Sequence, residues 1–160
     1  MRVLIVYYSL TGKTKLVAEA IAQTLGGDIR QIEEVSKRPA APLLYLTGGI
    51  SAAMGLKSKI KPINFDISDY DAIYLGTPIW GRKQVPAINA FISSVNFRNR
   101  NVILFATMGG DNYTVAIKTM TNKIEADGGK VLESFAIKTG DVKDEVIIEK
   151  AKELASKYLH

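Results

Sequence analysis

Five short apolar or alternating segments, each followed by polar turn residues, predict five β-strands along the chain, at residues 2–8, 28–35, 72–76, 101–107 and 130–139. Four other stretches repeat apolar residues every three or four positions, as the buried face of a helix does, at residues 16–25, 85–95, 116–124 and 147–158. Strands that alternate with helices form a parallel sheet covered on both faces. We therefore predict an α/β fold.

The polarity of these segments predicts the order of the strands. The first, third and fourth are almost wholly apolar, as expected of strands buried on both faces, whereas the second and fifth carry charged residues that suit the edges of a sheet. With right-handed crossovers, this gives a doubly wound five-stranded parallel sheet of order 2-1-3-4-5 with helices on both faces. A ligand is expected at the carboxyl ends of strands 1 and 3, where the chain reverses direction across the sheet.

The chain has 160 residues, and no repeat or linker divides it, so we expect a single domain over residues 1–160. Residues 39–62 fit the alternating pattern poorly, because three prolines and three glycines fall within them. This stretch must hold the second helix in an interrupted form, with a helical piece at residues 50–56.

The loop after the first strand reads SLTGKT, residues 9–14, and its end looks like a nucleotide-binding P-loop. A P-loop requires a glycine five positions before Gly12, where this chain has Tyr7, so the spacing excludes an ATP site of that kind. Three hydroxyl side chains around a glycine, at the start of a helix, instead suit a phosphate monoester. The alternative is an ordinary helix start capped by a Ser or Thr side chain.

Two further loops are predicted at the same edge of the sheet. TPIWG, residues 77–81, follows the third strand and holds the only tryptophan, Trp80, while TMGGDNY, residues 107–113, follows the fourth strand and ends in Tyr113. A phosphate site, two aromatic rings and two flexible turns together indicate a slot for a flat ring attached to a phosphate. The alternatives are that Trp80 is a packing residue and that Tyr113 only opens the fourth helix.

Composition narrows the chemistry that the protein's own side chains can perform. The chain has no cysteine, and its single histidine is His160, which argues against thiolate nucleophiles, iron–sulfur clusters, multi-histidine metal sites and imidazole general bases. Demanding chemistry is therefore expected from a bound organic cofactor. The first apolar run is too short for a signal peptide and no segment is long enough to cross a bilayer, so we expect a cytoplasmic protein without a membrane partner.

The net charge is +5, with an isoelectric point near 9.3. The basic residues are scattered along the chain, and no recognised nucleic-acid-binding motif accompanies them, which argues against nucleic acid as a partner. An acidic partner and a merely solvated basic surface both remain open.

The three loops, in order and correctly spaced, resemble those of the flavodoxins over nearly the whole chain. SLTGKT is similar to the family's phosphate loop, TPIWG to the loop whose aromatic stacks on the flavin, and GGDNY to the third flavin loop. The resemblance implies non-covalent FMN, with no metal and no catalytic side chain. It implies a cofactor site made of Ser9, Leu10, Thr11, Gly12, Lys13, Thr14, Thr77, Pro78, Ile79, Trp80, Gly81, Thr107, Met108, Gly109, Gly110, Asp111 and Tyr113.

The chain resembles the short-chain members of this family but departs from many of them in charge. Trp80 is followed by Gly81, Arg82 and Lys83, where many electron-carrying flavodoxins have acidic residues, and the whole chain is basic. The third loop is also short between Asp111 and Tyr113. We expect Arg82 and Lys83 to make the potential for the second electron less negative than in acidic relatives, unless both side chains are screened by solvent.

The resemblance implies a small electron carrier that shuttles electrons between a reductase and an acceptor. We expect a monomer or a weak dimer, and the basic charge of the chain, which departs from the family, suits partners with acidic docking faces. A second hypothesis is an FMN-dependent NAD(P)H oxidoreductase acting on quinones or similar acceptors. A third is a protein that binds a phosphate-bearing ligand without redox chemistry. Response-regulator and low-molecular-weight phosphatase functions share the topology but lack, here, the acidic cluster and the cysteine that they need.

Overall fold

The computed structural model describes residues 1–36, 56–110 and 112–158. Its parallel sheet has the order β2-β1-β3-β5-β6, which is the predicted order 2-1-3-4-5 once a short additional strand, β4, is set aside. The two polar strands lie at the edges, as predicted. The strands are β1 Val3–Tyr7, β2 Asp28–Gln31, β3 Ala72–Trp80, β4 Lys83–Gln84, β5 Asn101–Met108 and β6 Lys130–Lys138.

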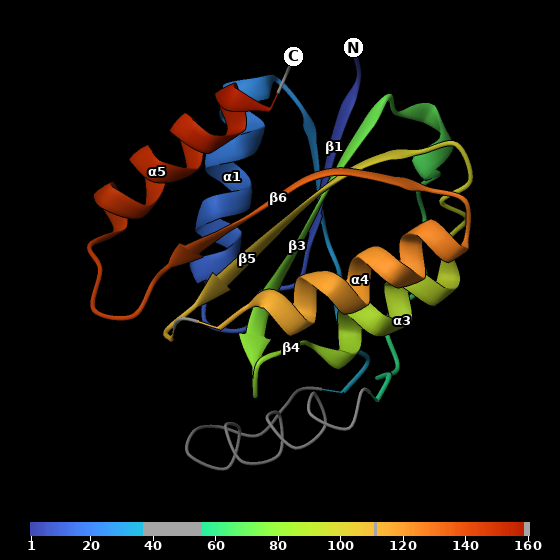
Figure 1. Ribbon diagram of the computed structural model, residues 1–160, viewed down its shortest axis with the longest axis horizontal. Coiled ribbons are helices and arrows are strands. Elements are labelled where there is room, and N and C mark those ends of the chain that lie inside the picture. The colour runs from blue at the N-terminus through green and yellow to red at the C-terminus, as the bar shows by residue number, and fades with distance from the viewer. Residues whose placement is uncertain (37–55, 111, 159–160) are drawn as a thin grey trace.

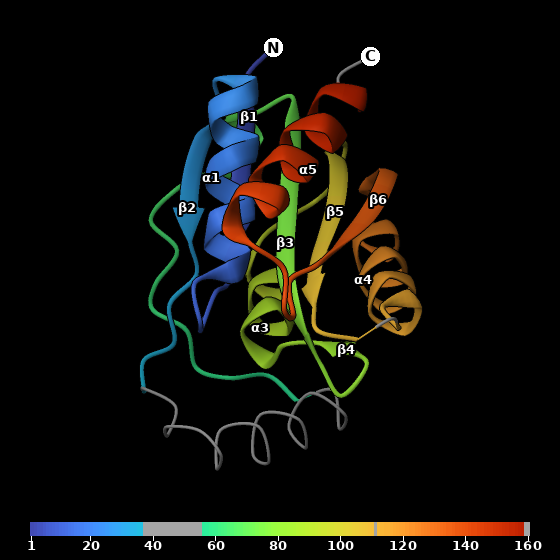
Figure 2. The ribbon, with the colours of Figure 1, turned by 90° about the vertical axis from the view of Figure 1, so that its left-hand side faces the viewer.

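In the part of the chain that the structure describes, two pairs of helices cover the sheet, one pair on each face (Figure 1). One pair is α1 Lys13–Leu25 and α5 Asp144–Lys157, which Figure 2 shows side by side in front of the sheet. The other pair is α3 Pro86–Ser94 and α4 Thr114–Ala126, and a short 3₁₀ helix at Ile67–Asp69 precedes β3. The interrupted helix expected within residues 39–62 falls almost wholly outside the described residues.

The sheet divides the core into two apolar clusters, because successive side chains of a strand point to opposite faces. In β1, Leu4 and Val6 enter the cluster covered by α3 and α4, whereas Val3, Ile5 and Tyr7 enter the cluster covered by α1 and α5. β3 and β5 divide their residues in the same way, so all three central strands are buried on both faces, as their continuous apolar runs predict.

β3 is longer than predicted, because residues 77–80 continue the strand instead of forming a loop. Pairing with β1 ends at Gly76, so Pro78, which has no N–H group to donate, lies beyond the part of β3 that pairs with β1 and still pairs with Thr107 of β5. Trp80 then pairs with Lys83 of β4. The two residues between them, Gly81 and Arg82, have φ angles of 54° and 68°, the left-handed values found in a tight hairpin turn.

In the described ranges, no helix combines the length and the apolar character that a membrane-crossing segment needs.

Candidate functional site

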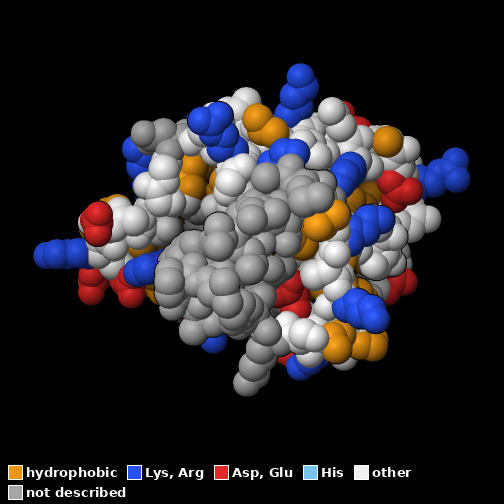
Figure 3. Space-filling view, turned by 90° about the horizontal axis from the view of Figure 1, so that it is seen from below, with side chains coloured by type: hydrophobic (Ala, Val, Ile, Leu, Met, Phe, Trp, Pro, Cys, Tyr) orange, Lys and Arg blue, Asp and Glu red, His pale blue; other side chains and the backbone are white. Residues whose placement is uncertain are grey.

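The carboxyl ends of β1, β3, β5 and β6 surround a cavity of about 330 Å³. Figure 3 looks onto this end of the molecule, where Lys and Arg side chains lie at several places around the rim. All three predicted loops contribute to the wall, and a fourth loop joins them. The lining residues are Leu10, Thr11, Lys13, Thr14, Pro78, Ile79, Trp80, Thr107, Met108, Gly109, Thr139 and Gly140.

The loop from β1 to α1 presents an open helix start to the cavity. Gly12 occupies the position before the helix with φ 95°, and no side chain caps the first turn of α1. The hydroxyl of Ser9 instead accepts a hydrogen bond from the Gly12 N–H (3.1 Å), within the loop itself. The alternative of a helix start capped by a side chain is therefore wrong, and no side chain occupies the first-turn N–H groups at the positive end of the helix dipole.

Two buried hydroxyls join this helix to the neighbouring strand. Thr14 Oγ1 and Thr107 Oγ1 lie 2.7 Å apart, and the two residues are 2% and 3% exposed. One hydroxyl donates to the other, and the pair carries two protons, so one proton remains available to a ligand oxygen. Both residues line the cavity.

Trp80 lines the cavity with a half-buried ring whose orientation is set by a neighbouring aromatic. The ring of Tyr8 meets it edge-on, with centroids 5.9 Å apart and an interplanar angle of 85°. Tyr8 is in turn fixed by its hydroxyl, which donates to Glu34 Oε2 (2.8 Å). In this edge contact Tyr8 does not stack on a face of the Trp80 ring.

Thr77, a predicted site residue, supports the hairpin instead of facing the cavity. It is fully buried, its hydroxyl donates to the carbonyl of Pro78 (2.8 Å), and it accepts from the Val85 N–H (3.2 Å). Gly81 lies in an adjoining hollow of about 390 Å³, which shares Ile79, Met108 and Gly109 with the cavity and adds Arg82, Gly110 and Asn112.

Three other residues that the sequence analysis assigned to the site, Tyr113, Ser9 and Asp111, are not found in the lining of the cavity. Tyr113 lines neither hollow; it immediately precedes α4, and its carbonyl accepts from the Ile117 N–H (3.1 Å). This position agrees with the alternative that Tyr113 opens the fourth helix. Ser9 borders a separate hollow beside Glu34, and Asp111 lies outside the described residues.

The sequence reasoning missed Thr139 and Gly140, which follow β6 and complete the wall. The Thr139 N–H donates to the Met108 carbonyl (2.9 Å). A Cβ atom on Gly140 would lie 3.1 Å from the Cα of Gly109, so a larger residue at this position would push the two loops slightly apart. The signal was available, because the end of every parallel strand reaches the same edge of the sheet.

Charge at the cavity comes mainly from Lys13. Its Nζ atom lies 2.6 Å from Asp144 Oδ1, at the start of α5, and both side chains are substantially exposed, so the pair contributes at most about 1 kcal/mol. In the ranges that the structure describes, acidic, cysteine and histidine side chains form no group of three that could hold a metal ion.

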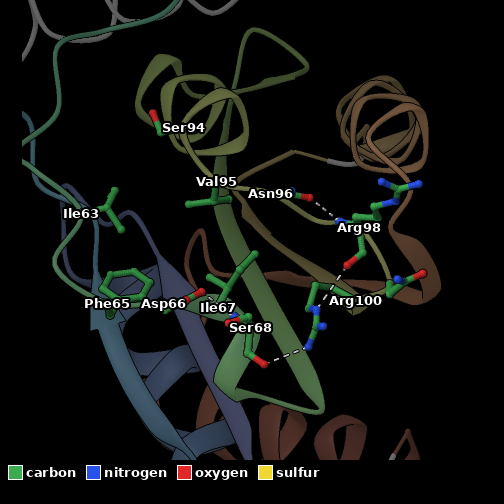
Figure 4. A pocket seen from close by; sticks show the side chains of 11 residues that line it. Ile63, Phe65, Asp66, Ile67, Ser68, Ser94, Val95, Asn96, Arg98 and Arg100 are labelled. Carbon is green, nitrogen blue, oxygen red and sulfur yellow. Dashed lines mark hydrogen bonds between the residues drawn. The ribbon is translucent and has the colours of Figure 1, made fainter.

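A larger hollow, of about 690 Å³, lies at the opposite end of the sheet, before β3 and β5 (Figure 4). Two arginines, Arg98 and Arg100, line this hollow, and the guanidinium of Arg100 is already bonded within the protein. Arg100 donates to the carbonyls of Ser68 (3.0 Å) and Tyr70 (3.4 Å) through Nη1, and to the carbonyl of Arg98 (3.3 Å) through Nε. These bonds connect the 3₁₀ helix to the start of β5, which indicates a structural role.

Comparison with known proteins identifies the family. A match to the family described as Flavodoxin covers residues 2–147. The chain belongs to the flavodoxin family. A flavodoxin from a Nostoc species is 24% identical over 154 residues, covering 91% of this chain and 76% of that protein.

Solved structures agree with this assignment. A Bacteroides uniformis protein has a TM-score of 0.78 at 25% identity and covers 94% of this chain and 97% of its own. A Lactobacillus acidophilus flavoprotein, solved in complex with FMN, has a TM-score of 0.71 at 24% identity, covering 93% of this chain and 97% of its own. The sheet order and helix layers are those of a flavodoxin, as the strand pattern predicted, and the family is the one that the three loop motifs resemble.

Proposed function

We propose that this protein binds FMN without a covalent bond and carries electrons between redox partner proteins. The observation that supports it best is a single cavity that brings together an uncapped helix start, Trp80 and a glycine-containing backbone turn. FMN has a phosphate at one end and a flat ring at the other, and these wall elements suit each end. Membership of the flavodoxin family and the likeness to an FMN-bound flavoprotein support the same ligand.

Different residues of the cavity would contact different parts of the ligand. First-turn N–H groups of α1, with the hydroxyls of Thr11 and the Thr14–Thr107 pair, would hold the phosphate. Trp80 would stack on the ring, and the backbone at Gly109 would contact the ring's edge. FMN supplies the redox chemistry when bound, so the chain needs only to bind it, orient it and limit its contact with water.

The proposal is tested by adding FMN to the purified protein and following flavin fluorescence. We expect quenching that saturates, a yellow protein after gel filtration, and release of FMN on denaturation. Riboflavin, which lacks the phosphate, should bind at least about tenfold more weakly, because each charge-assisted hydrogen bond contributes about 1.5–3 kcal/mol. A colourless protein that leaves FMN fluorescence unchanged would refute the proposal.

Two variants test whether Trp80, and not Tyr113, stacks on the flavin. Trp80→Leu should weaken FMN binding about 10-fold or more, since stacking of a flat base on an aromatic side chain contributes about 1–3 kcal/mol. Tyr113→Leu is the matched control, because Tyr113 lines neither hollow and its loss should leave the affinity unchanged. Equal effects of the two changes would exclude the stacking role of Trp80.

A second function, direct oxidation of NAD(P)H, is favoured by one feature. The hollow beside Gly81, Arg82 and Asn112 adjoins the proposed flavin site and leaves space for a second small molecule. Anaerobic mixing of the FMN-loaded protein with NADH or NADPH decides between the two functions. Rapid bleaching of the flavin without a helper reductase would establish the oxidoreductase function. Slow bleaching would favour the function of an electron carrier.

A further inference from the structure

Trp80, Tyr8 and Glu34 form a series of direct contacts that leads away from the cavity. Trp80 lines the cavity and is the only tryptophan of the chain. The Tyr8 ring meets it edge-on with centroids 5.9 Å apart, which is contact distance for two aromatic rings. The Tyr8 hydroxyl donates a hydrogen bond to Glu34 Oε2 across 2.8 Å. Each side chain therefore contacts the next.

This arrangement suits the transfer of one electron together with one proton. Tryptophan and tyrosine are among the side chains that lose an electron most readily. A phenol that loses an electron becomes strongly acidic, so the loss is easiest where a base takes the proton in the same step. A proton acceptor must lie within about 2.6–3.2 Å, and Glu34 meets this condition. Tyr8 is 5% exposed, so bulk water is largely excluded from the contact.

Two other tyrosines show what is specific to Tyr8. Tyr7 packs in the apolar cluster on the opposite face of the sheet from Tyr8 and Trp80, and its hydroxyl donates to the uncharged amide oxygen of Gln31 (3.2 Å). Tyr70 does donate to a carboxylate, that of Asp28 (2.8 Å). It precedes β3, however, whereas Trp80 is the last residue of that strand, so the two lie about 30 Å apart. Tyr8 combines the contact with Trp80 and the carboxylate acceptor.

We propose that Tyr8 and Glu34 form a relay that returns an electron to Trp80 after Trp80 has been oxidised. The oxidant is a light-excited flavin ring in the cavity, so this role rests on the proposed function. Trp80 loses one electron to the ring. Tyr8 then passes one electron to Trp80 and its hydroxyl proton to Glu34 Oε2, which leaves neutral Trp80, a neutral tyrosyl radical and a protonated Glu34. Tyr8 is restored by the electron from the ring and the proton from Glu34, so no further reactant is consumed.

The relay is tested in the FMN-free protein by pulse radiolysis with azide radicals, which oxidise tryptophan by one electron. The absorbance of the tryptophan radical reports on Trp80 alone, because the chain has no other tryptophan. We expect it to decay as the absorbance of a tyrosyl radical grows, at a rate independent of protein concentration. Tyr8→Phe keeps an aromatic ring and should abolish this coupled growth. Unchanged kinetics in Tyr8→Phe would overturn the relay.

Two matched variants control for the other tyrosines. Tyr7→Phe removes the hydroxyl next in sequence, and Tyr70→Phe removes a hydroxyl that is bonded to a carboxylate but distant from Trp80. Both should leave the decay of the Trp80 radical unchanged. A decay that is slowed by either of them as much as by Tyr8→Phe would show that the electron takes another route.

The proton step is tested by changing the acceptor. Glu34→Gln keeps an oxygen that can accept from Tyr8 but removes the basic group. It should slow the transfer at least about tenfold, since a positioned general base contributes about 10²–10⁴-fold. The transfer should also be slower in D₂O. Glu33→Gln is the matched control, because the Glu33 carboxylate bonds Lys61 instead, and equal rates in the two variants would overturn the role of Glu34.

Illumination of the FMN-loaded protein connects the relay to the cavity. Tyr8→Phe should accumulate oxidised Trp80 faster than the natural protein, as measured by peptide mass spectrometry, because the radical persists. Equal accumulation would show that the relay does not act on oxidation by the flavin. Radiolysis needs no flavin, so a wrong relay and a wrong FMN site give different results: the first removes the coupled growth of the tyrosyl radical, and the second removes the quenching of FMN fluorescence.

Discussion

At the scale of single residues, Tyr74 in β3 buries a polar hydroxyl group in the apolar core. The side chain is 1% exposed, and its hydroxyl has no hydrogen-bond partner among the described residues. A buried hydroxyl without a partner costs about 1–3 kcal/mol. Tyr74→Phe should therefore raise the free energy of unfolding in urea by about 1 kcal/mol. Tyr70→Phe is the control and should lower it, because the Tyr70 hydroxyl donates to Asp28 (2.8 Å).

The same residue makes stability depend on alkaline pH. Burial raises the pKa of Tyr74 to about 12, from 10.0 for the exposed group. A phenol whose pKa is higher in the folded state contributes stability that is complete below pH 10 and is lost as the pH rises toward 12. The advantage of Tyr74→Phe should therefore grow between pH 10 and 12 in parallel urea titrations. An advantage that stays constant with pH would show that the hydroxyl ionises equally in both states.

At the scale of elements, the β3–β4 hairpin contains a residue in an unfavourable backbone conformation. Arg82 has φ 68°, where a residue with a Cβ atom costs about 1 kcal/mol more than glycine. Arg82→Gly should raise the free energy of unfolding of the FMN-free protein by about 0.5–1 kcal/mol. Lys83→Gly, one residue further and inside β4, should lower it. If Arg82→Gly is less stable than the natural protein, the interactions of the Arg82 side chain stabilise the fold by more than its unfavourable backbone conformation destabilises it.

The hairpin also places two positive charges beside the proposed flavin site. Arg82 lines the adjoining hollow, and Lys83 pairs with Trp80. For a charge about 8 Å away, the effect on a reduced, anionic flavin is about 0.5–2 kcal/mol, or on the order of 20–90 mV. Changing both residues to Glu should make the potential for the second electron more negative, as measured by anaerobic redox titration. Lys152→Glu is the distant control, and an unchanged potential in the double variant would show that solvent screens these charges.

Most helices and strands could be predicted from the sequence because their signals are local. The prediction failed where pairing with a neighbouring strand determines where a strand ends. The apolar runs of β1 and β5 and the charged residues of β2 predict their places in the sheet without further information. The end of β3 could not be predicted in this way. Pro78 reads as a loop residue, and only the end of β1 pairing at Gly76 makes proline acceptable in the strand.

The sequence analysis identified site residues where residue chemistry is distinctive, and it missed those that only their position in the fold indicates. Thr14, Trp80 and Gly109 line the cavity, as their loop motifs predict. Thr139 and Gly140 carry no distinctive chemistry, and their role depends on the close approach of two loops. Whether Tyr113 faces the cavity depends on where α4 begins, which sequence patterns locate only within a few residues.

At the scale of the whole molecule, the net charge of +5 predicts which partners receive electrons fastest. Figure 3 shows Lys and Arg side chains around the rim of the face that holds the proposed flavin site, with Asp and Glu side chains among them. Because the excess charge is positive, a partner with an acidic docking face would be attracted to the protein. Small oxidants of opposite charge separate this effect from specific docking. The reduced, FMN-loaded protein should be reoxidised faster by an anionic oxidant, ferricyanide, at low salt, and the rate should fall about tenfold between 10 and 200 mM sodium chloride. A cationic cobalt complex should show the opposite dependence on salt, because screening relieves its repulsion. If both oxidants respond to salt alike, the charge around the flavin is not positive, and the expectation of acidic partners is wrong.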